Sequence, residues 1–186
     1  MMEKTMVVTG YKAYEMNIRS AKDDRLPYIK KAIKDRLIGF IENGGEWVLT
    51  SGQIGIELWT CEVVLELKAD YDIKYAIIPP FNQQEIRWQE QDQELYFHLV
   101  NEADYYALLY EDNYKGPYQF AARDSWLIEK SDCCLLVVDE EFPGSVGFFL
   151  DRAKQYRESN DYAIYYMTSD DLNDTIREMQ ENNQSF

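Results

Sequence analysis

Short apolar runs alternate with segments of helical periodicity along almost the whole chain, and this alternation limits the possible folds more than any other feature. The runs predicted as strands are residues 5–10, 46–51, 75–81, 105–110, 133–139 and 163–168. Most are continuously apolar, as in Ala76-Ile77-Ile78, which is typical of strands covered on both faces. Strands that alternate with helices predict a parallel sheet between helical layers.

Helical patterns fill the gaps between these runs. The clearest spans residues 27–43, where Ile29, Ile33 and Leu37 share one face and Pro27 suits the first turn. The other helical candidates are residues 54–68, 84–103 (one broken helix or two), 118–131, 145–158 and 169–181, followed by a frayed tail over 180–186. The sequence therefore predicts an α/β fold: one Rossmann-like domain over residues 1–186, a three-layer αβα sandwich with a mainly parallel sheet.

Composition excludes several classes of function. The 186 residues include 34 acidic and 19 basic side chains, and the formal net charge of −15 argues against broad binding to nucleic acid or to an anionic membrane. No run reaches membrane-spanning length, and the N-terminus lacks a signal-peptide pattern. The cysteines lack CxxC spacing, and His98 is the only histidine, so we expect a cytoplasmic protein with reduced thiols and no metal.

The first candidate loop, Thr9-Gly10-Tyr11-Lys12, directly follows the first predicted strand. Gly10 permits a close approach of the backbone to a ligand, and Lys12 can reach a phosphate. The spacing is not GxGxxG, so the dinucleotide fingerprint is absent. Taken alone, the loop favours the alternative interpretation, a plain turn glycine.

The second candidate loop, residues 51–57, reads as the end of a strand, a turn with two glycines and the start of a helix. This order places free backbone N–H groups and the positive end of a helix dipole at one point, which suits a phosphate. Glu57 either faces a ligand hydroxyl or only stabilises the helix start. Both loops follow parallel strands, so we expect them at the same edge of the sheet.

Two further segments carry weaker signals. Arg123-Asp124 lies on a predicted helix from which an arginine can reach the carboxyl edge, although a surface ion pair is the simpler interpretation. After the fifth strand, Gly144 and Ser145 can form a second anion-binding turn, and Asp139 can contact ribose hydroxyls. A solvated acidic loop is the simpler interpretation of that segment.

Three stretches together resemble the YpsA family of firmicute bacteria: residues 8–12, 47–59 and 117–124. The Ser-Gly-Gln-x-Gly-x-Glu-Leu-Trp block at 51–59 is the most specific of them. That family belongs to the SLOG superfamily of Rossmann-like proteins, with the LOG phosphoribohydrolases and the DNA-processing protein DprA. The resemblance implies a nucleotide-type ligand, such as NAD or an ADP-ribose derivative, and a link to cell division. It brings no settled enzyme activity.

The same resemblance implies site residues. Gly52, Gly55 and Glu57 match the presumed ligand pocket of the family, and Thr9-Gly10 match its first ligand loop. Arg123 falls where LOG enzymes place an arginine ahead of a Pro-Gly-Gly-x-Gly-Thr-x-x-Glu loop.

In that LOG loop this chain has three departures. Ser145, Phe148 and Asp151 stand where the LOG pattern has glycine, threonine and the catalytic glutamate. The shorter Asp151 carboxyl would be misplaced for catalysis, so these departures favour binding over hydrolysis.

We therefore predict a nucleotide-binding protein. The residues predicted to bind the ligand are Thr9, Gly10, Tyr11, Lys12, Ser51, Gly52, Gln53, Gly55, Glu57, Arg123, Asp139, Gly144 and Ser145. Backbone N–H groups of residues 51–55 would bind phosphate, and Glu57 would accept hydrogen bonds from ribose hydroxyls. The alternatives are a hydrolase of nucleotide N-glycosidic bonds and a regulatory adaptor. The expected partner is a small-molecule nucleotide; a protein partner or a second copy remains open, and single-stranded DNA is disfavoured by the charge.

Overall fold

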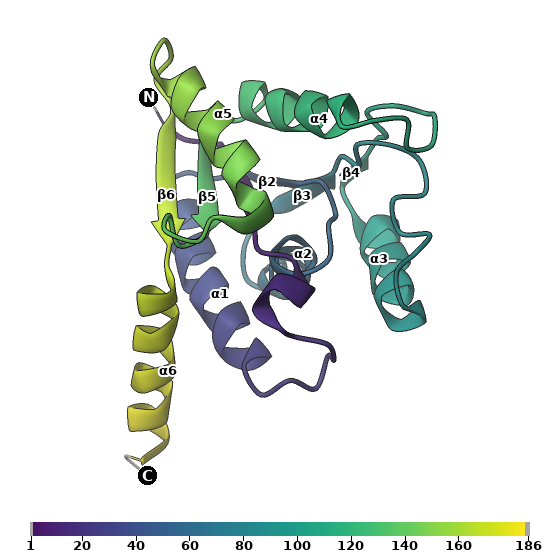
Figure 1. The fold of residues 1–186 in the computed structure, drawn as a ribbon. Helices are drawn as coiled ribbons and strands as arrows, with labels where there is room; N and C mark the ends of the chain where they lie inside the picture. The colour runs from purple at the N-terminus through teal and green to yellow at the C-terminus, as the bar shows by residue number, and fades with distance from the viewer. Residues whose placement is uncertain (1, 185–186) are drawn as a thin grey trace.

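The computed structural model describes residues 2–184 and contains a six-stranded parallel sheet between two helical layers (Figure 1). The strands are β1 (Thr5–Gly10), β2 (Trp47–Thr50), β3 (Lys74–Ile77), β4 (Tyr105–Tyr106), β5 (Cys133–Val137) and β6 (Ala163–Met167). Their order in the sheet is β4-β3-β2-β1-β5-β6, and every neighbouring pair is parallel. The predicted Rossmann-like α/β fold is confirmed.

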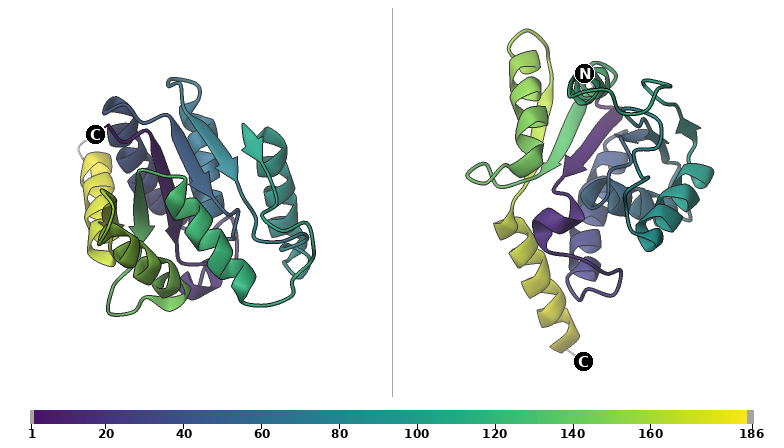
Figure 2. Two further views of the ribbon diagram at one scale, coloured as in Figure 1. Left: turned by 90° about the horizontal axis from the view of Figure 1, so that it is seen from above. Right: turned by 45° about the vertical axis from the view of Figure 1, so that its right-hand side comes forward.

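The helices divide between the two faces of the sheet, as Figure 2 shows. One face carries α1 (Leu26–Glu42), α2 (Ile56–Leu67), α3 (Glu90–Glu102) and α6 (Ser169–Gln184); the other carries α4 (Tyr118–Glu129) and α5 (Gly147–Arg157). Two short 3-10 helices, η1 (Ala13–Met16) and η2 (Gly144–Val146), follow β1 and β5.

The core consists of two apolar layers separated by the sheet, and the alternation of side chains along each strand assigns residues to them. On β5, Cys133 lies in the α1–α2 layer, whereas Cys134 lies in the α4–α5 layer. Both thiols are free and fully buried. Because every residue of β5 is buried, the strand sequence is continuously apolar, as the pattern indicated.

Several segments differ from the sequence-based prediction: the strands predicted at 75–81 and 133–139 end at Ile77 and Val137, and the helix predicted at 145–158 is divided into η2 and α5. Strand β4 covers only two residues of the predicted 105–110, and the first part of 84–103 forms turns before α3 begins. Helix α6 continues to Gln184, so the frayed tail predicted from residue 180 is wrong up to there, and residues 185–186 lie outside the described part.

The order of the strands fixes where a ligand can bind. From β1 the chain proceeds outward through β2 and β3 to β4, with α1, α2 and α3 on one face of the sheet. It then forms α4 on the opposite face and returns to place β5 on the other side of β1. Loops that leave β1 and β5 therefore turn to opposite faces. In doubly wound sheets, ligands bind in the crevice that forms at the carboxyl edge beside such a reversal.

Candidate functional site

A cavity of about 410 Å³ lies at the carboxyl ends of β1 and β2, between α4 and the start of α5. The predicted ligand residues that line it are Thr9, Gly10, Lys12, Ser51, Gln53, Glu57, Arg123 and Ser145. The sheet thus brings together residues from both candidate loops, from α4 and from the segment after β5. Tyr11, Gly52, Gly55, Asp139 and Gly144 are not among the residues that line it.

Glu57 is a buried acidic residue that lines the cavity. Its side chain is buried, with 7% of the residue exposed. One carboxylate oxygen accepts hydrogen bonds from Ser51 N (2.6 Å) and Ser51 Oγ (2.7 Å), and the other accepts one from Thr9 Oγ1 (2.9 Å). The carboxylate therefore ties the ends of β1 and β2 to the first turn of α2.

The burial of Glu57 is costly because a buried carboxylate normally has a basic partner. Within residues 2–184, none of the ion pairs involves Glu57. The positive end of the α2 dipole and the hydrogen bonds from Ser51 and Thr9 offset part of this cost. Burial of this carboxylate beside a cavity makes Glu57 a candidate functional residue.

The backbone N–H groups of the turn before α2 form more hydrogen bonds within the protein than the sequence indicated. The amide of Ile54 donates to Gln53 Oε1, that of Leu58 to the Gln53 carbonyl, and that of Ile56 to the Tyr11 carbonyl. Several N–H groups at this helix start are thus used within the protein, which leaves few for the phosphate predicted there. Gly55 also lies against the loop that follows β1.

Arg123 forms one wall of the cavity and is held in place from two directions. Its Nε and Nη2 atoms lie 3.0 and 2.9 Å from Asp124 Oδ1, and its guanidinium carbon lies 5.2 Å from the centre of the Phe120 ring. Asp124 is only 4% exposed. Burial raises the pKa of Asp124, the negative charge of Glu57 raises it further, and Arg123 opposes both effects.

Three predicted ligand residues contribute to a different part of the molecule. Tyr11 Oη donates to the Phe142 carbonyl (2.5 Å) and accepts from Asp139 N (2.9 Å). The Asp139 carboxylate accepts hydrogen bonds from the amide and hydroxyl of Ser169 at the start of α6. Tyr11, Asp139 and Gly144 line a second cavity, between α1 and α6.

Metal-binding and membrane-spanning features were sought in residues 2–184. No group of His, Cys, Asp and Glu side chains there is arranged to hold a metal ion. No helix in the same range combines the length and the apolar character needed to cross a bilayer.

Comparison with known proteins assigns the chain to a family. The model for YpsA, described as the YspA SLOG family, matches residues 6–172. The chain belongs to the YpsA family. UPF0398 protein YpsA of Bacillus subtilis is 44% identical over 176 residues, covering 94% of this chain and 98% of that protein. A UPF0398 protein of Oceanobacillus iheyensis is 43% identical over 177 residues, covering 95% of each chain.

The fold of this YpsA-family chain is also found in a DNA-processing protein. DNA processing protein A from Helicobacter pylori, solved in a study of its single-stranded DNA binding mode, superimposes with a TM-score of 0.54 at 12% sequence identity. The match covers 87% of this chain and 64% of that one, so the YpsA-family chain spans less than two thirds of the neighbour. At this identity the likeness establishes the shared fold alone.

The predicted ligand set of the YpsA-family chain omitted several residues that line the cavity, among them Phe120 on α4 and Phe148 and Arg152 on α5. Arg152 and Phe148 lie one helical turn apart on α5 and line the cavity, and Phe148 is 76% exposed at its rim. Asp151, which aligns with the LOG glutamate, is exposed and is not among the lining residues. The spacing shows that Phe148 and Arg152 share one face of the helix, but it does not show that this face meets the cavity.

Proposed function

We propose that this protein binds a nucleotide or a nucleotide derivative in the cavity between α4 and α5. The observation that carries the proposal is Glu57, a buried carboxylate that lines the cavity and has no ion pair within residues 2–184. Its position at the carboxyl edge, beside the reversal of strand order, is where doubly wound sheets bind such ligands.

The hydrogen bonds around Glu57 define which ligand groups fit beside it. The hydroxyls of Thr9 and Ser51 both donate to the carboxylate, so they present lone pairs to a ligand. Three of the roughly four acceptor sites of the carboxylate are used, which leaves about one. This corner therefore suits donors such as the ribose hydroxyls and disfavours a phosphate.

The phosphate is better placed against α4 and α5. Arg123 and Arg152 both line that side of the cavity, and Lys12 lies on the rim of the β1 loop. Arginine matches phosphate geometry because its planar fork can donate two parallel hydrogen bonds. This assignment replaces the phosphate site expected at the turn of residues 51–55.

The remaining lining is aromatic and suits a base. Phe120 lies beside Arg123 on α4, and the exposed Phe148 stands on α5. A planar base stacks favourably on such rings. The volume of about 410 Å³ is near the lower end of the range for ligand pockets, so it favours one nucleotide, or one half of NAD or ADP-ribose.

A binding experiment with matched variants tests the proposal. AMP, ADP-ribose, NAD and ATP are titrated against the wild type, Glu57→Gln and Glu66→Gln, with thermal unfolding as the readout. A ligand at 100 times its dissociation constant stabilises the folded state by about 2.7 kcal/mol, which is readily detected. We expect the stabilisation to be lost in Glu57→Gln and kept in Glu66→Gln, which changes an exposed glutamate on the same helix.

Two results would overturn this proposal: no stabilisation of the wild type by any of these ligands, or equal stabilisation of Glu57→Gln. If Glu57→Gln does not fold, Arg152→Ala replaces it, because Arg152 is exposed and its loss leaves the core intact. This variant should bind AMP more weakly than the wild type but bind adenosine equally well.

One observation favours a second candidate, hydrolysis of the N-glycosidic bond. Asp124 has a raised pKa and lines the same cavity as Glu57. A carboxyl whose environment raises its pKa can act as a general acid toward the leaving base. Release of free base from AMP or NAD, abolished in Asp124→Asn, would establish this activity, and its absence in the wild type would exclude it for these substrates.

Two further roles remain proposals with their own tests. A regulatory role in cell division predicts that a pull-down of protein partners depends on the bound nucleotide. Binding of single-stranded DNA, as in the DNA processing protein A neighbour, is disfavoured by the net charge of −15. A gel shift at low salt tests that binding.

A further inference from the structure

Glu15 occupies the anion-binding turn that the sequence predicted after β5. Its Oε2 accepts a hydrogen bond from Ser145 N (2.9 Å), and its Oε1 accepts one from Ser145 Oγ (2.5 Å). A further bond to Oε1 comes from Lys12 N (2.9 Å). The carboxylate thus uses the backbone and hydroxyl donors that a phosphate would need.

The turn is shaped to hold this carboxylate. Gly144 has a φ of 53°, and a β-carbon at this position would collide with Glu15 Oε2. Ser145 and Lys12, which donate to the carboxylate, both line the cavity between α4 and α5. Glu15 and Gly144 themselves line the second cavity, between α1 and α6, so the filled turn lies between the two cavities.

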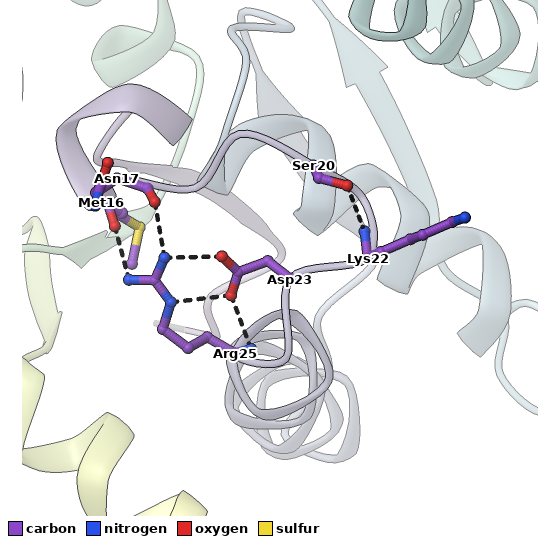
Figure 3. Close-up of polar contacts among 6 residues, drawn as sticks. All are labelled: Met16, Asn17, Ser20, Lys22, Asp23 and Arg25. Carbon is purple, nitrogen blue, oxygen red and sulfur yellow. Dashed lines mark hydrogen bonds and ion pairs between the residues drawn. The ribbon is translucent and has the colours of Figure 1, made fainter.

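The segment that carries Glu15 is itself fixed, as Figure 3 shows. The Arg25 guanidinium donates to the carbonyl oxygens of Met16 (2.9 Å) and Asn17 (2.8 Å), at the end of η1. Asp23 binds the same guanidinium through both carboxylate oxygens. Arg25 therefore holds η1 in the position from which Glu15 reaches the turn.

We infer that Glu15 is a specificity-determining residue, which fills the anion site after β5 and excludes a ligand phosphate from it. This inference rests on the proposed function and deepens it. Two anions cannot share the donors of Ser145 and Lys12, because like charges at such distances repel strongly. The ligand is then a nucleotide whose phosphate faces Arg123 and Arg152, while its uncharged part lies toward Ser145.

Inorganic phosphate provides a probe that does not depend on nucleotide binding. Three variants are compared with the wild type. Glu15→Ala empties the turn, and Glu15→Gln keeps it filled without the charge. Glu46→Ala is the control, because it changes the net charge by the same amount as Glu15→Ala but at the opposite edge of the sheet. Phosphate affinity is measured by calorimetry for each. We expect Glu15→Ala to bind phosphate ~10-fold or more tightly than the wild type, with Glu15→Gln between them and Glu46→Ala unchanged.

A double variant, Glu15→Ala with Ser145→Ala, tests whether the gain in phosphate affinity arises at the turn. The double variant should lose the gain that Glu15→Ala shows. Equal phosphate affinity of Glu15→Ala and the wild type would overturn the inference, whatever the nucleotide screen shows. A gain in Glu15→Ala combined with no nucleotide bound by the wild type would support the role of Glu15 and overturn only the proposed function. If Glu15→Ala does not fold, a gain in Glu15→Gln supports the inference, and its absence overturns it.

Discussion

Gly55 holds the two ligand loops together by having no side chain. Its φ is 100°, and a β-carbon there would lie 2.5 Å from Ala13 N and 2.6 Å from Tyr11 O. The sequence predicted Gly55 as a ligand position. From the sequence alone, a glycine that makes room for a phosphate cannot be distinguished from one that makes room for a neighbouring loop. In the structure, Gly55 makes room for the loop after β1.

We predict that Gly55→Ala lowers the free energy of unfolding by about 2–3 kcal/mol, since it adds both backbone strain and a collision with the loop after β1. Gly39→Ala, within α1, is the control. A β-carbon added there would meet no heavy atom within 4 Å beyond its own helix backbone. This substitution should therefore raise the free energy of unfolding by about 0.5–1 kcal/mol. Urea unfolding measures both. Equal effects at the two glycines would contradict the packing argument.

The cavity also shows which single residues can be recognised from sequence. Glu57 was identified because its place in a strand-turn-helix pattern is local information. Glu15 was not, since its significance depends on Ser145, which lies 130 positions further along the chain. Phe148 and Arg152 were missed for a similar reason: nothing local reveals which face of α5 meets α4.

At the scale of elements, helix α6 depends on the loop that follows β5. Ser169 at its start donates to Asp139, and Thr168 and Asp171 bond reciprocally, Thr168 N to the Asp171 carboxylate and Asp171 N to Thr168 Oγ1. No residue of α6 is fully buried, so these end contacts and its packing on α1 fix the helix. In the structure Asp139, predicted as a ribose contact, accepts hydrogen bonds from Ser169 at this helix start.

We predict that Asp139→Ala destabilises the first turn of α6 by about 1 kcal/mol, because the Ser169 amide loses its acceptor. Hydrogen exchange of the α6 amides should accelerate, while AMP affinity should not change, since Asp139 does not line the candidate ligand cavity. Asp139→Asn keeps one acceptor oxygen and should show a smaller effect. Loss of AMP binding in Asp139→Ala would instead support a ribose contact for this residue.

The elements were predictable where burial determines the residue types of a segment. Strand β1 was predicted to the residue because Gly10 ends an apolar run, and β5 was predicted because it is buried throughout. The length of strand β4 was overestimated. Tyr105 and Tyr106 are 52% and 42% exposed, so these aromatic residues lie at the surface and do not indicate a buried strand. The turns before α3 follow from contacts that no local pattern records.

For the molecule as a whole, acid stability follows from carboxyl groups with shifted pKa values. Burial raises the pKa of Glu15, but hydrogen bonds from Ser145 and Lys12 outweigh it, so the pKa lies below the ordinary 4.5. Hydrogen bonds from Arg25 lower the pKa of Asp23 to about 2. Such groups bind protons more tightly in the unfolded chain, so the stability they contribute is complete above the ordinary pKa and is lost as the pH falls through the folded value.

We predict that the free energy of unfolding decreases as the pH falls below about 4.5, and that Glu15→Gln makes the decrease shallower. Asp124 has the opposite sign: its pKa is raised by burial, so its protonation favours the folded state and Asp124→Asn should steepen the decrease. Urea unfolding at a series of pH values measures these slopes. Identical slopes for the wild type and Glu15→Gln would contradict the assignment.

The strand order also has a consequence for how the chain is made. The first four strands in sequence form one contiguous part of the sheet, β4-β3-β2-β1, and β5 later pairs with the open side of β1. During synthesis, β1 therefore has an unpaired edge until residues 133–137 leave the ribosome, and unpaired edges invite aggregation. The candidate ligand cavity is likewise incomplete until α5 emerges, so its lining is assembled only after most of the chain has been translated.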